Sequence, residues 1–283
     1  MNNKHLTTIF IAALLCMLCS CNHATQPTIL STDSVVSIKA EGSNMECKIT
    51  ADYPNSDDSL SHSVAAYING ELARLYLPII NGEDNKQKYP AYNGEPTDGK
   101  AVADFYTSGT LENMKAQAKE LEEAGMKETP SLSYELAVRK TADNDRYVSY
   151  ETTAYSFLGG AHGSAVKYTA NIAKPSGTVL AQTVDTLQTK KLQPILRKGV
   201  LGYLHENGDS TVTDKTLNET LFIENGIIPM PAHAPYLADD GVHFVYQQYE
   251  IGPYAMGMVA FTVPYTEIKP YLTKEALALV KQD

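Results

Sequence analysis

The chain has 283 residues, with 23 lysines and arginines against 33 aspartates and glutamates, and its formal net charge at pH 7 is −10. This surplus of acid disfavours nucleic acid and anionic lipid headgroups as partners and attracts basic ones. Only four cysteines are present, so a dense disulfide framework is excluded.

The N-terminal residues predict a secreted, lipid-anchored protein. Lys4 precedes an apolar run from Leu6 to Leu18, which is typical of a bacterial secretion signal and is shorter than the roughly 20 residues that span a bilayer. The run ends in "LCSC", which resembles the lipobox of bacterial lipoproteins, with Cys21 as the lipid-modified residue. An ordinary soluble secreted protein is the alternative.

These features set the expected domain organisation and location. We expect a lipoprotein signal peptide at 1–20, a flexible tether at 21–33 and an α+β domain at 34–283, with an N-terminal part at 34–130 and a C-terminal part at 131–283. The lipid on Cys21 would attach this domain to a membrane of the bacterial cell envelope, at the outer membrane or on the extracytoplasmic face.

The N-terminal part reads as two strands followed by two helices. The turn-forming "EGSN" joins "SVVSIKA" to "MECKITADY" and predicts a hairpin in which Cys47 is a small buried residue. Residues 81–100 are rich in turn formers and predict an exposed loop between the helices. The first helix should end before Pro78 and the second at Gly125. Apolar residues at helical spacing define the two helices: Leu60, Val64, Ile68, Leu72 and Leu75, then Leu111, Met114, Ala118 and Leu121.

The C-terminal part is richer in strands. Two strands flank "ADND", with Leu132, Tyr134, Leu136 and Val138 alternating, and "SAVKYTANIAK" is a third that "PSG" turns into "TVLAQTV". A helix follows, and Pro194 favours a start later than Lys190 because proline suits a first turn. The apolar run "AMGMVAFTV" predicts a central strand covered on both sides, and a helix capped by Thr273 closes the chain.

Together these elements predict an α+β fold in one compact domain. Strands grouped in neighbouring runs favour an antiparallel meander over an alternating parallel fold, and about four helices would pack against the sheet.

Three segments together resemble a known envelope family. They are "GGAHG" before an alternating strand, a helix after "TVDTLQ", and "GVHFVYQQYEIGPYAMGMVAFTVPY" near the C-terminus. The combination resembles the extracytoplasmic domain shared by the anti-sigma factor RsiV and the N-terminal region of the peptidoglycan deacetylase PdaC. The resemblance implies a ligand-binding module, since the RsiV domain binds lysozyme. The chain shows neither a membrane-spanning helix with a sigma-binding region nor an appended deacetylase domain, so we expect neither transmembrane signalling nor deacetylation to carry over.

His162 in "GGAHG" is the first candidate for chemistry. Ser164 follows closely, but on an extended strand the two side chains would lie about 6–7 Å apart, too far for a direct hydrogen bond. No G-x-S-x-G or HGGG-type motif is present, so we predict no catalytic residue and interpret the glycines as a bend or bulge around a structural imidazole. The histidines are dispersed without zinc-site spacing, and neither a metal site nor a cofactor is predicted.

Other side chains are candidates for ligand contact. His233 lies between two prolines in "PMPAHAP", a stiff loop that could present an imidazole to a partner. Tyr249 and Tyr254 could anchor an interface. His162 is a further candidate for ligand contact. The spacing of Tyr246 and Tyr249 nevertheless favours core positions for both, and Pro253 with Tyr254 predicts a bend.

The leading functional hypothesis is a non-catalytic, lipid-anchored binding protein of the envelope. Its ligand would be a basic wall-active protein such as a lysozyme-like hydrolase, or a peptidoglycan fragment, met by loops 81–100 and 228–238. A peptidoglycan hydrolase or deacetylase with His162 as base, and a purely structural lipoprotein, are the alternatives.

Overall fold

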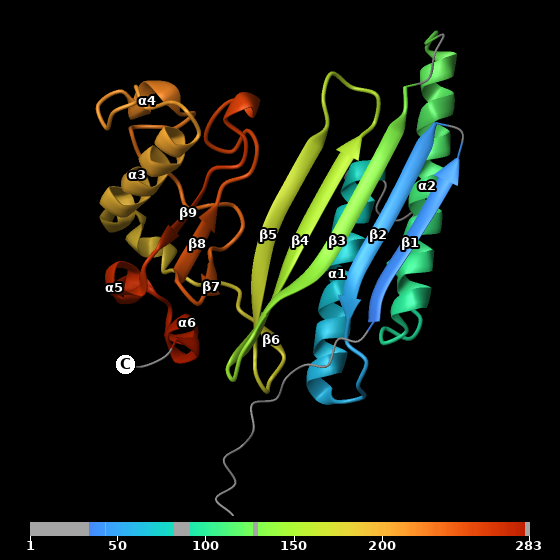
Figure 1. Cartoon of the computed structure of the whole chain (residues 1–283), viewed down its shortest axis with the longest axis horizontal. Coiled ribbons are helices and arrows are strands. Elements are labelled where there is room, and N and C mark those ends of the chain that lie inside the picture. The colour runs from blue at the N-terminus through green and yellow to red at the C-terminus, as the bar shows by residue number, and fades with distance from the viewer. Residues whose placement is uncertain (1–33, 43, 82–90, 127–129, 281–283) are drawn as a thin grey trace, which may run out of the picture.

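A computed structural model describes residues 34–42, 44–81, 91–126 and 130–280 (Figure 1). The expected signal peptide, Cys21 and the tether lie outside the described residues, as do residues 82–90 of the expected loop at 81–100. Within the described ranges, no helix is both long and apolar enough to cross a membrane.

In the described part of the chain, six strands form one sheet in the order β1-β2-β3-β4-β5-β6. The strands are β1 (Ser34–Gly42), β2 (Met45–Tyr53), β3 (Leu132–Asp143), β4 (Tyr147–Phe157), β5 (Ser164–Ala173) and β6 (Thr178–Val179). Every neighbouring pair is antiparallel except β2 and β3, which are parallel. The predicted α+β class with a mostly antiparallel sheet is confirmed. The prediction of a pure antiparallel meander is wrong at β2 and β3. Two helices connect these strands and return the chain to the same end of the sheet, so the strands run parallel.

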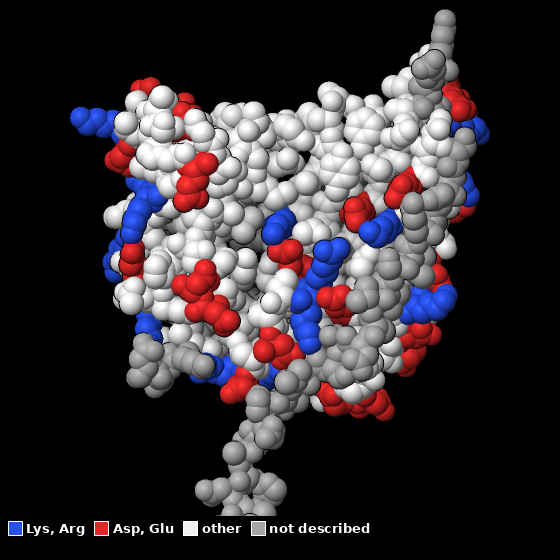
Figure 2. Space-filling view, in the orientation of Figure 1, with Lys and Arg blue, Asp and Glu red and all other residues white. Residues whose placement is uncertain are grey.

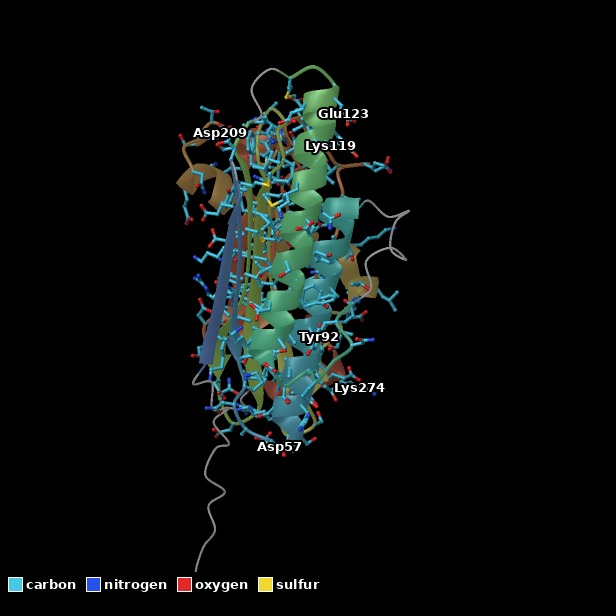
Figure 3. All side chains as sticks on the ribbon, turned by 90° about the vertical axis from the view of Figure 1, so that its right-hand side faces the viewer. Asp57, Tyr92, Lys119, Glu123, Asp209 and Lys274 are labelled. Atoms are coloured by element: carbon cyan, nitrogen blue, oxygen red, sulfur yellow. The ribbon has the colours of Figure 1, made fainter. Side chains whose placement is uncertain are left out.

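Those two helices, α1 (Ser59–Asn81) and α2 (Gly99–Glu123), cover one face of the sheet (Figures 1 and 3). The predicted stripe of α1 is confirmed: Leu60, Val64, Ile68, Leu72 and Leu75 are all at most 6% exposed. The apolar stripe therefore faces the sheet, as burial of a single helix face requires.

The ends of these helices differ in part from the prediction. The prediction that α1 ends before Pro78 is wrong, because the helix runs on to Asn81 and a proline in its last turns removes only one intrahelical hydrogen bond. Helix α2 begins earlier than its apolar stripe suggests, where the Asp98 side chain caps it by accepting from the Ala101 amide. The predicted stop at Gly125 is confirmed by a left-handed backbone with φ of +93°.

A second lobe follows β6 and has its own core. It contains a three-stranded antiparallel sheet, β7-β8-β9, and the helices around it. Its elements are η2 (Thr186–Gln188), α3 (Thr189–Glu206), α4 (Leu217–Thr220), β7 (Tyr236–Ala238), β8 (Gly241–Val245), η3 (Tyr254–Met256), β9 (Ala260–Val263), α5 (Tyr265–Ile268), η4 (Lys269–Tyr271) and α6 (Lys274–Leu279). We call this region the second lobe and the six-stranded sheet with α1 and α2 the first lobe.

Several expectations for the second lobe are corrected. Strand β8, and not the run "AMGMVAFTV", is central; only Ala260–Val263 of that run is strand, and it forms the edge β9. Helix α3 starts before Lys190 and contains Pro194. The closing helix is divided into α5, η4 and α6, because Pro270 cannot continue the hydrogen bonding of α5, whereas Thr273 does cap α6.

Side-chain amides join β5 of the first lobe to the second lobe, one amide from each side. The Gln247 side chain accepts from the Lys167 amide at 3.0 Å and donates to the Lys167 carbonyl at 2.8 Å. The buried Asn171 side chain bonds the Leu237 amide at 2.7 Å and its carbonyl at 3.0 Å. These amides take the place of a neighbouring strand and satisfy a sheet edge. They also place the segment after β8 beside the loop between β4 and β5.

Candidate functional site

His162 lies in the loop between β4 and β5 and contacts two tyrosines of the second lobe. Its ring stacks on Tyr254 with the centroids 4.0 Å apart and 24° between the planes. Nε2 of His162 lies 3.2 Å from the Tyr249 hydroxyl, and Nδ1 lies 2.9 Å from the Gly163 carbonyl oxygen. One neutral tautomer satisfies both contacts: Nδ1–H donates to the carbonyl, and Nε2 accepts from the phenol.

The glycine loop is shaped around a fourth aromatic ring. Gly159 has φ of +89°, which disfavours any residue with a Cβ. A Cβ on Gly163 would lie 2.4 Å from the Tyr155 ring, so only glycine lets the backbone cross that ring. The Tyr254 hydroxyl donates to the Gly163 carbonyl at 3.1 Å and joins the loop to the second lobe. The predicted bend is confirmed, and its hydrogen bonds connect the lobes.

These rings form an exposed aromatic surface, which we define as Tyr155, His162, Tyr249 and Tyr254. Tyr249 is 54% exposed and Tyr155 45% exposed. In the space-filling view, the upper central area over the ends of β4 and β5 carries no charged side chain (Figure 2). Exposed rings without neighbouring charge are typical of contact surfaces.

Tyr249 is the clearest correction to the sequence-based expectations. It was expected in the core with Tyr246, but only Tyr246 is buried, with an exposed fraction of 0%. The chain leaves β8 after Val245, so strand alternation no longer applies at Tyr249. Tyr249 also has φ of +66°, the left-handed region that a bulky residue rarely adopts. The predicted bend at Pro253 is confirmed, since Pro253 starts the turn η3.

His233, the fourth candidate for ligand contact, lies apart from the aromatic surface. Its ring stacks on Tyr168 of β5, with the centroids 4.2 Å apart and the planes 13° apart. The Arg74 guanidinium lies 4.6 Å from the centroid of the same Tyr168 ring. Arg74 also forms a bidentate pair with Glu71, at 3.1 and 3.3 Å, and the Tyr168 hydroxyl donates to Glu71. A cavity of about 200 Å³ opens beside this cluster.

Burial is the main cause of the pKa shifts of Glu71 and His233 in the His233 cluster. Burial raises the pKa of Glu71, and the Arg74 charge opposes the rise. Burial and the nearby Arg74 lower the pKa of His233, which favours the neutral imidazole. Sequence reasoning missed Glu71, Arg74 and Tyr168, because a carboxylate in a helix and a tyrosine in a strand carry no local sign of their neighbours.

Two further expectations concern metals and cysteine. Among residues 34–42, 44–81, 91–126 and 130–280, no three His, Cys, Asp or Glu side chains are grouped so that they could hold a metal ion. Cys47 is fully buried in β2, and burial raises the pKa of its thiol to about 12, so the thiol stays protonated.

Comparison with known proteins finds a family match in each of two segments. Residues 40–165 match the family model described as deacetylase PdaC, and residues 186–266 match that of a protein of unknown function, DUF3298. The segment similar to PdaC contains Tyr155 and His162 of the aromatic surface, and the segment similar to DUF3298 contains Tyr249 and Tyr254.

Solved structures show the same fold. The crystal structure of a DUF3298 family member from Bacteroides fragilis matches with a TM-score of 0.63 at 20% identity, over 86% of this chain and 93% of that chain. A DUF3298 family protein from Pseudomonas aeruginosa matches with a TM-score of 0.52 at 15% identity, over 87% of this chain and 97% of that chain. No curated protein matches this chain significantly.

Proposed function

We propose that this protein is a lipid-anchored, ligand-binding protein of the bacterial cell envelope, and that the aromatic surface is where the ligand binds. The observation that carries the proposal is the convergence of exposed rings from both lobes, with His162 bonded to Tyr249 across 87 residues of sequence. A surface made by two lobes depends on their mutual position, which is a property suited to recognition.

The backbone at Tyr249 supports this role. Holding a non-glycine residue in the left-handed region costs on the order of 1 kcal/mol or more. Tyr249 is 54% exposed, so burial of its side chain does not offset the cost of the strained backbone. Such strain persists when the surrounding structure requires it, and it is concentrated at binding sites.

Charge favours a basic protein as the ligand. The net charge of −10 would attract a cationic wall-active protein, such as a lysozyme-like hydrolase. Tyrosine is an effective anchor in protein interfaces because it buries a large rigid area at little conformational cost. A peptidoglycan fragment could stack on the same rings, and it is tested in parallel.

The experiment measures binding of hen lysozyme and of purified muropeptides to the full chain and to Tyr249→Ser. We expect lysozyme affinity to fall roughly 10- to 100-fold, the usual effect of removing an aromatic anchor. Leu187→Ser is the control, because Leu187 is 94% exposed and lies outside the aromatic surface. Equal affinity in Tyr249→Ser and the wild type, or no binding of either ligand, would refute the proposal.

Deacetylation is the second candidate, since the model matched by residues 40–165 is described as a deacetylase. Release of acetate from peptidoglycan by the full chain, lost in His162→Gln without loss of folding, would favour it over binding alone.

A further inference from the structure

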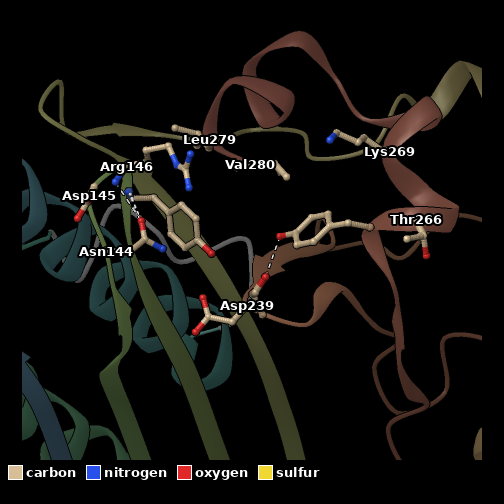
Figure 4. A pocket seen from close by; sticks show the side chains of 11 residues that line it. Asn144, Asp145, Arg146, Asp239, Thr266, Lys269, Leu279 and Val280 are labelled. Carbon is tan, nitrogen blue, oxygen red and sulfur yellow. Dashed lines mark hydrogen bonds between the residues drawn. The ribbon is translucent and has the colours of Figure 1, made fainter. Parts of the chain in front are cut away.

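A cavity of about 480 Å³ lies between the two lobes, apart from the aromatic surface (Figure 4). The turn between β3 and β4 forms one wall, and the segment from α5 to the end of α6 forms the other. This volume lies within the range of small-molecule sites in proteins.

Two cations line the cavity from opposite lobes. Arg146 belongs to the β3–β4 turn and Lys269 to η4, so they stand on different walls in Figure 4. Both side chains are half-buried, and neither has a hydrogen bond or ion pair to any residue of the described chain. Two cations that face one cavity without an ion pair to a described residue favour an anionic group between them.

The Arg146 side chain is the strongest indication of a missing acceptor. Its Nε is buried and has no hydrogen-bond partner within the described residues. The neighbouring Asn144 side chain cannot serve, because it already accepts from the backbone amides of Arg146 and Tyr147, each at 3.0 Å. A buried unsatisfied donor on a charged group is costly, and a carboxylate bound in the cavity would satisfy it with a bidentate geometry.

Two carboxylates line the same cavity and narrow the ligand class. Asp145 and Asp239 are both exposed to it, one from each lobe. Burial raises the pKa of Tyr147, Asp239 adds to the rise and Arg146 opposes it, so both charges lie near this tyrosine. A multiply charged anion such as phosphate would be repelled by these acids, whereas an ammonium group on the ligand would be attracted.

The remaining walls suit a compact organic ligand. Tyr147 and Tyr265 contribute rings, and the Tyr265 hydroxyl is already engaged by the Ala238 carbonyl at 2.7 Å. Leu279 and Val280 add apolar surface. The walls therefore offer nonpolar contact between the two charged ends.

We propose that this cavity binds a small zwitterion, an amino acid or short peptide, whose carboxylate is held by Arg146 and Lys269 and whose ammonium group is held by Asp239. The site is distinct from the aromatic surface and does not depend on the function proposed there.

Isothermal titration of the full chain with alanyl-alanine tests the proposal, with acetate, ethylamine and inorganic phosphate as partial ligands. We expect saturable binding of the dipeptide, weaker binding of each partial ligand, and a loss of roughly 10- to 100-fold in dipeptide affinity in Arg146→Gln. Arg139→Gln is the matched control, because Arg139 is an exposed arginine of β3 outside the cavity, and it should bind as the wild type does.

Asp239→Asn tests binding of the ammonium group separately from binding of the carboxylate, and it changes an exposed side chain. It should weaken the dipeptide and leave acetate unchanged, while Tyr249→Ser should change neither. Failure of the dipeptide to bind, equal affinity in Arg146→Gln and Arg139→Gln, or phosphate binding more tightly than the dipeptide would each overturn the proposal.

Discussion

His162 shows how one imidazole can organise a surface. Both of its ring nitrogens contact neutral groups, the Gly163 carbonyl and the Tyr249 hydroxyl, and its face is covered by Tyr254. Its described hydrogen bonds lead to no carboxylate. The ring therefore helps to hold two tyrosines of the second lobe against a glycine loop of the first, together with the hydrogen bond from Tyr254 to Gly163.

His233 allows a prediction about pH. The pKa of His233 in the folded state lies below the usual histidine value of about 6.5. Burial is the main cause of the lowering, the Arg74 charge lowers the pKa further, and the Glu71 charge opposes the change. Between the two values the unfolded chain binds a proton that the folded chain does not, so stability falls as pH falls through that window. We expect the Tm of the wild type to drop more than that of His233→Gln between pH 7.5 and 5.5.

The measurement is thermal unfolding by circular dichroism at closely spaced pH values. Glu71, Arg74 and Tyr168 face His233 in both proteins, so the difference between the two curves reports on the imidazole. Parallel curves would show that His233 does not titrate differently on folding.

Among the elements, α3 shows how tertiary contacts can override local sequence. Pro194 lies inside the helix, where its missing amide normally ends regular hydrogen bonding. The neighbouring Gln193 side chain donates to the Thr189 carbonyl at 3.1 Å and exchanges two hydrogen bonds with the Ile228 backbone, at 2.8 and 2.9 Å. These contacts hold the first turns of α3 on the core, so the helix can start at Thr189 in spite of the proline.

Two glycines of the same helix predict opposite effects of one substitution. A Cβ on Gly199 would lie 2.2 Å from the Phe261 ring of β9, whereas a Cβ on Gly202 would meet nothing within 4 Å. Gly199→Ala should therefore destabilise the protein by about 1–3 kcal/mol through overpacking. Gly202→Ala should stabilise it by roughly 0.5–1 kcal/mol, because alanine loses less backbone entropy in a helix.

Urea unfolding of both variants, with the free energy of unfolding extrapolated to water, checks the pair. Destabilisation by both substitutions to the same degree would contradict the packing of α3 on β9 described above.

At the scale of the whole molecule, two cores are joined along the edge of one strand. The first lobe ends at β6, so the boundary between the two sheets lies near residue 180. Side-chain amides of Gln247 and Asn171 join the lobes at β5, and the aromatic surface and the zwitterion cavity both lie where the lobes meet. Both proposed sites would therefore respond to a change in the position of one lobe relative to the other.

The proposed membrane anchor is also a property of the whole chain. If Cys21 carries the lipid, Cys21→Ser should move the protein from the membrane fraction to the soluble fraction of the cell, because removing the acyl chains removes nearly all membrane affinity. Cys47→Ser is the matched control, since Cys47 is buried in β2 and should leave the distribution unchanged. Fractionation with immunoblotting measures both, and a membrane-bound Cys21→Ser protein would contradict the anchor.

The sequence by itself determined the local features. The alternation of Leu132, Tyr134, Leu136 and Val138, the stripe of α1 and the cap at Thr273 are all present as predicted, because residues close in sequence set strand period, helix period and capping. Only the tertiary structure decided which segments meet. It decided the parallel pairing of β2 with β3, the exposure of Tyr249 and its contact with His162, and the placement of Arg146 and Lys269 on one cavity. Periodicity describes a segment's own faces, whereas these contacts follow from how the two lobes pack.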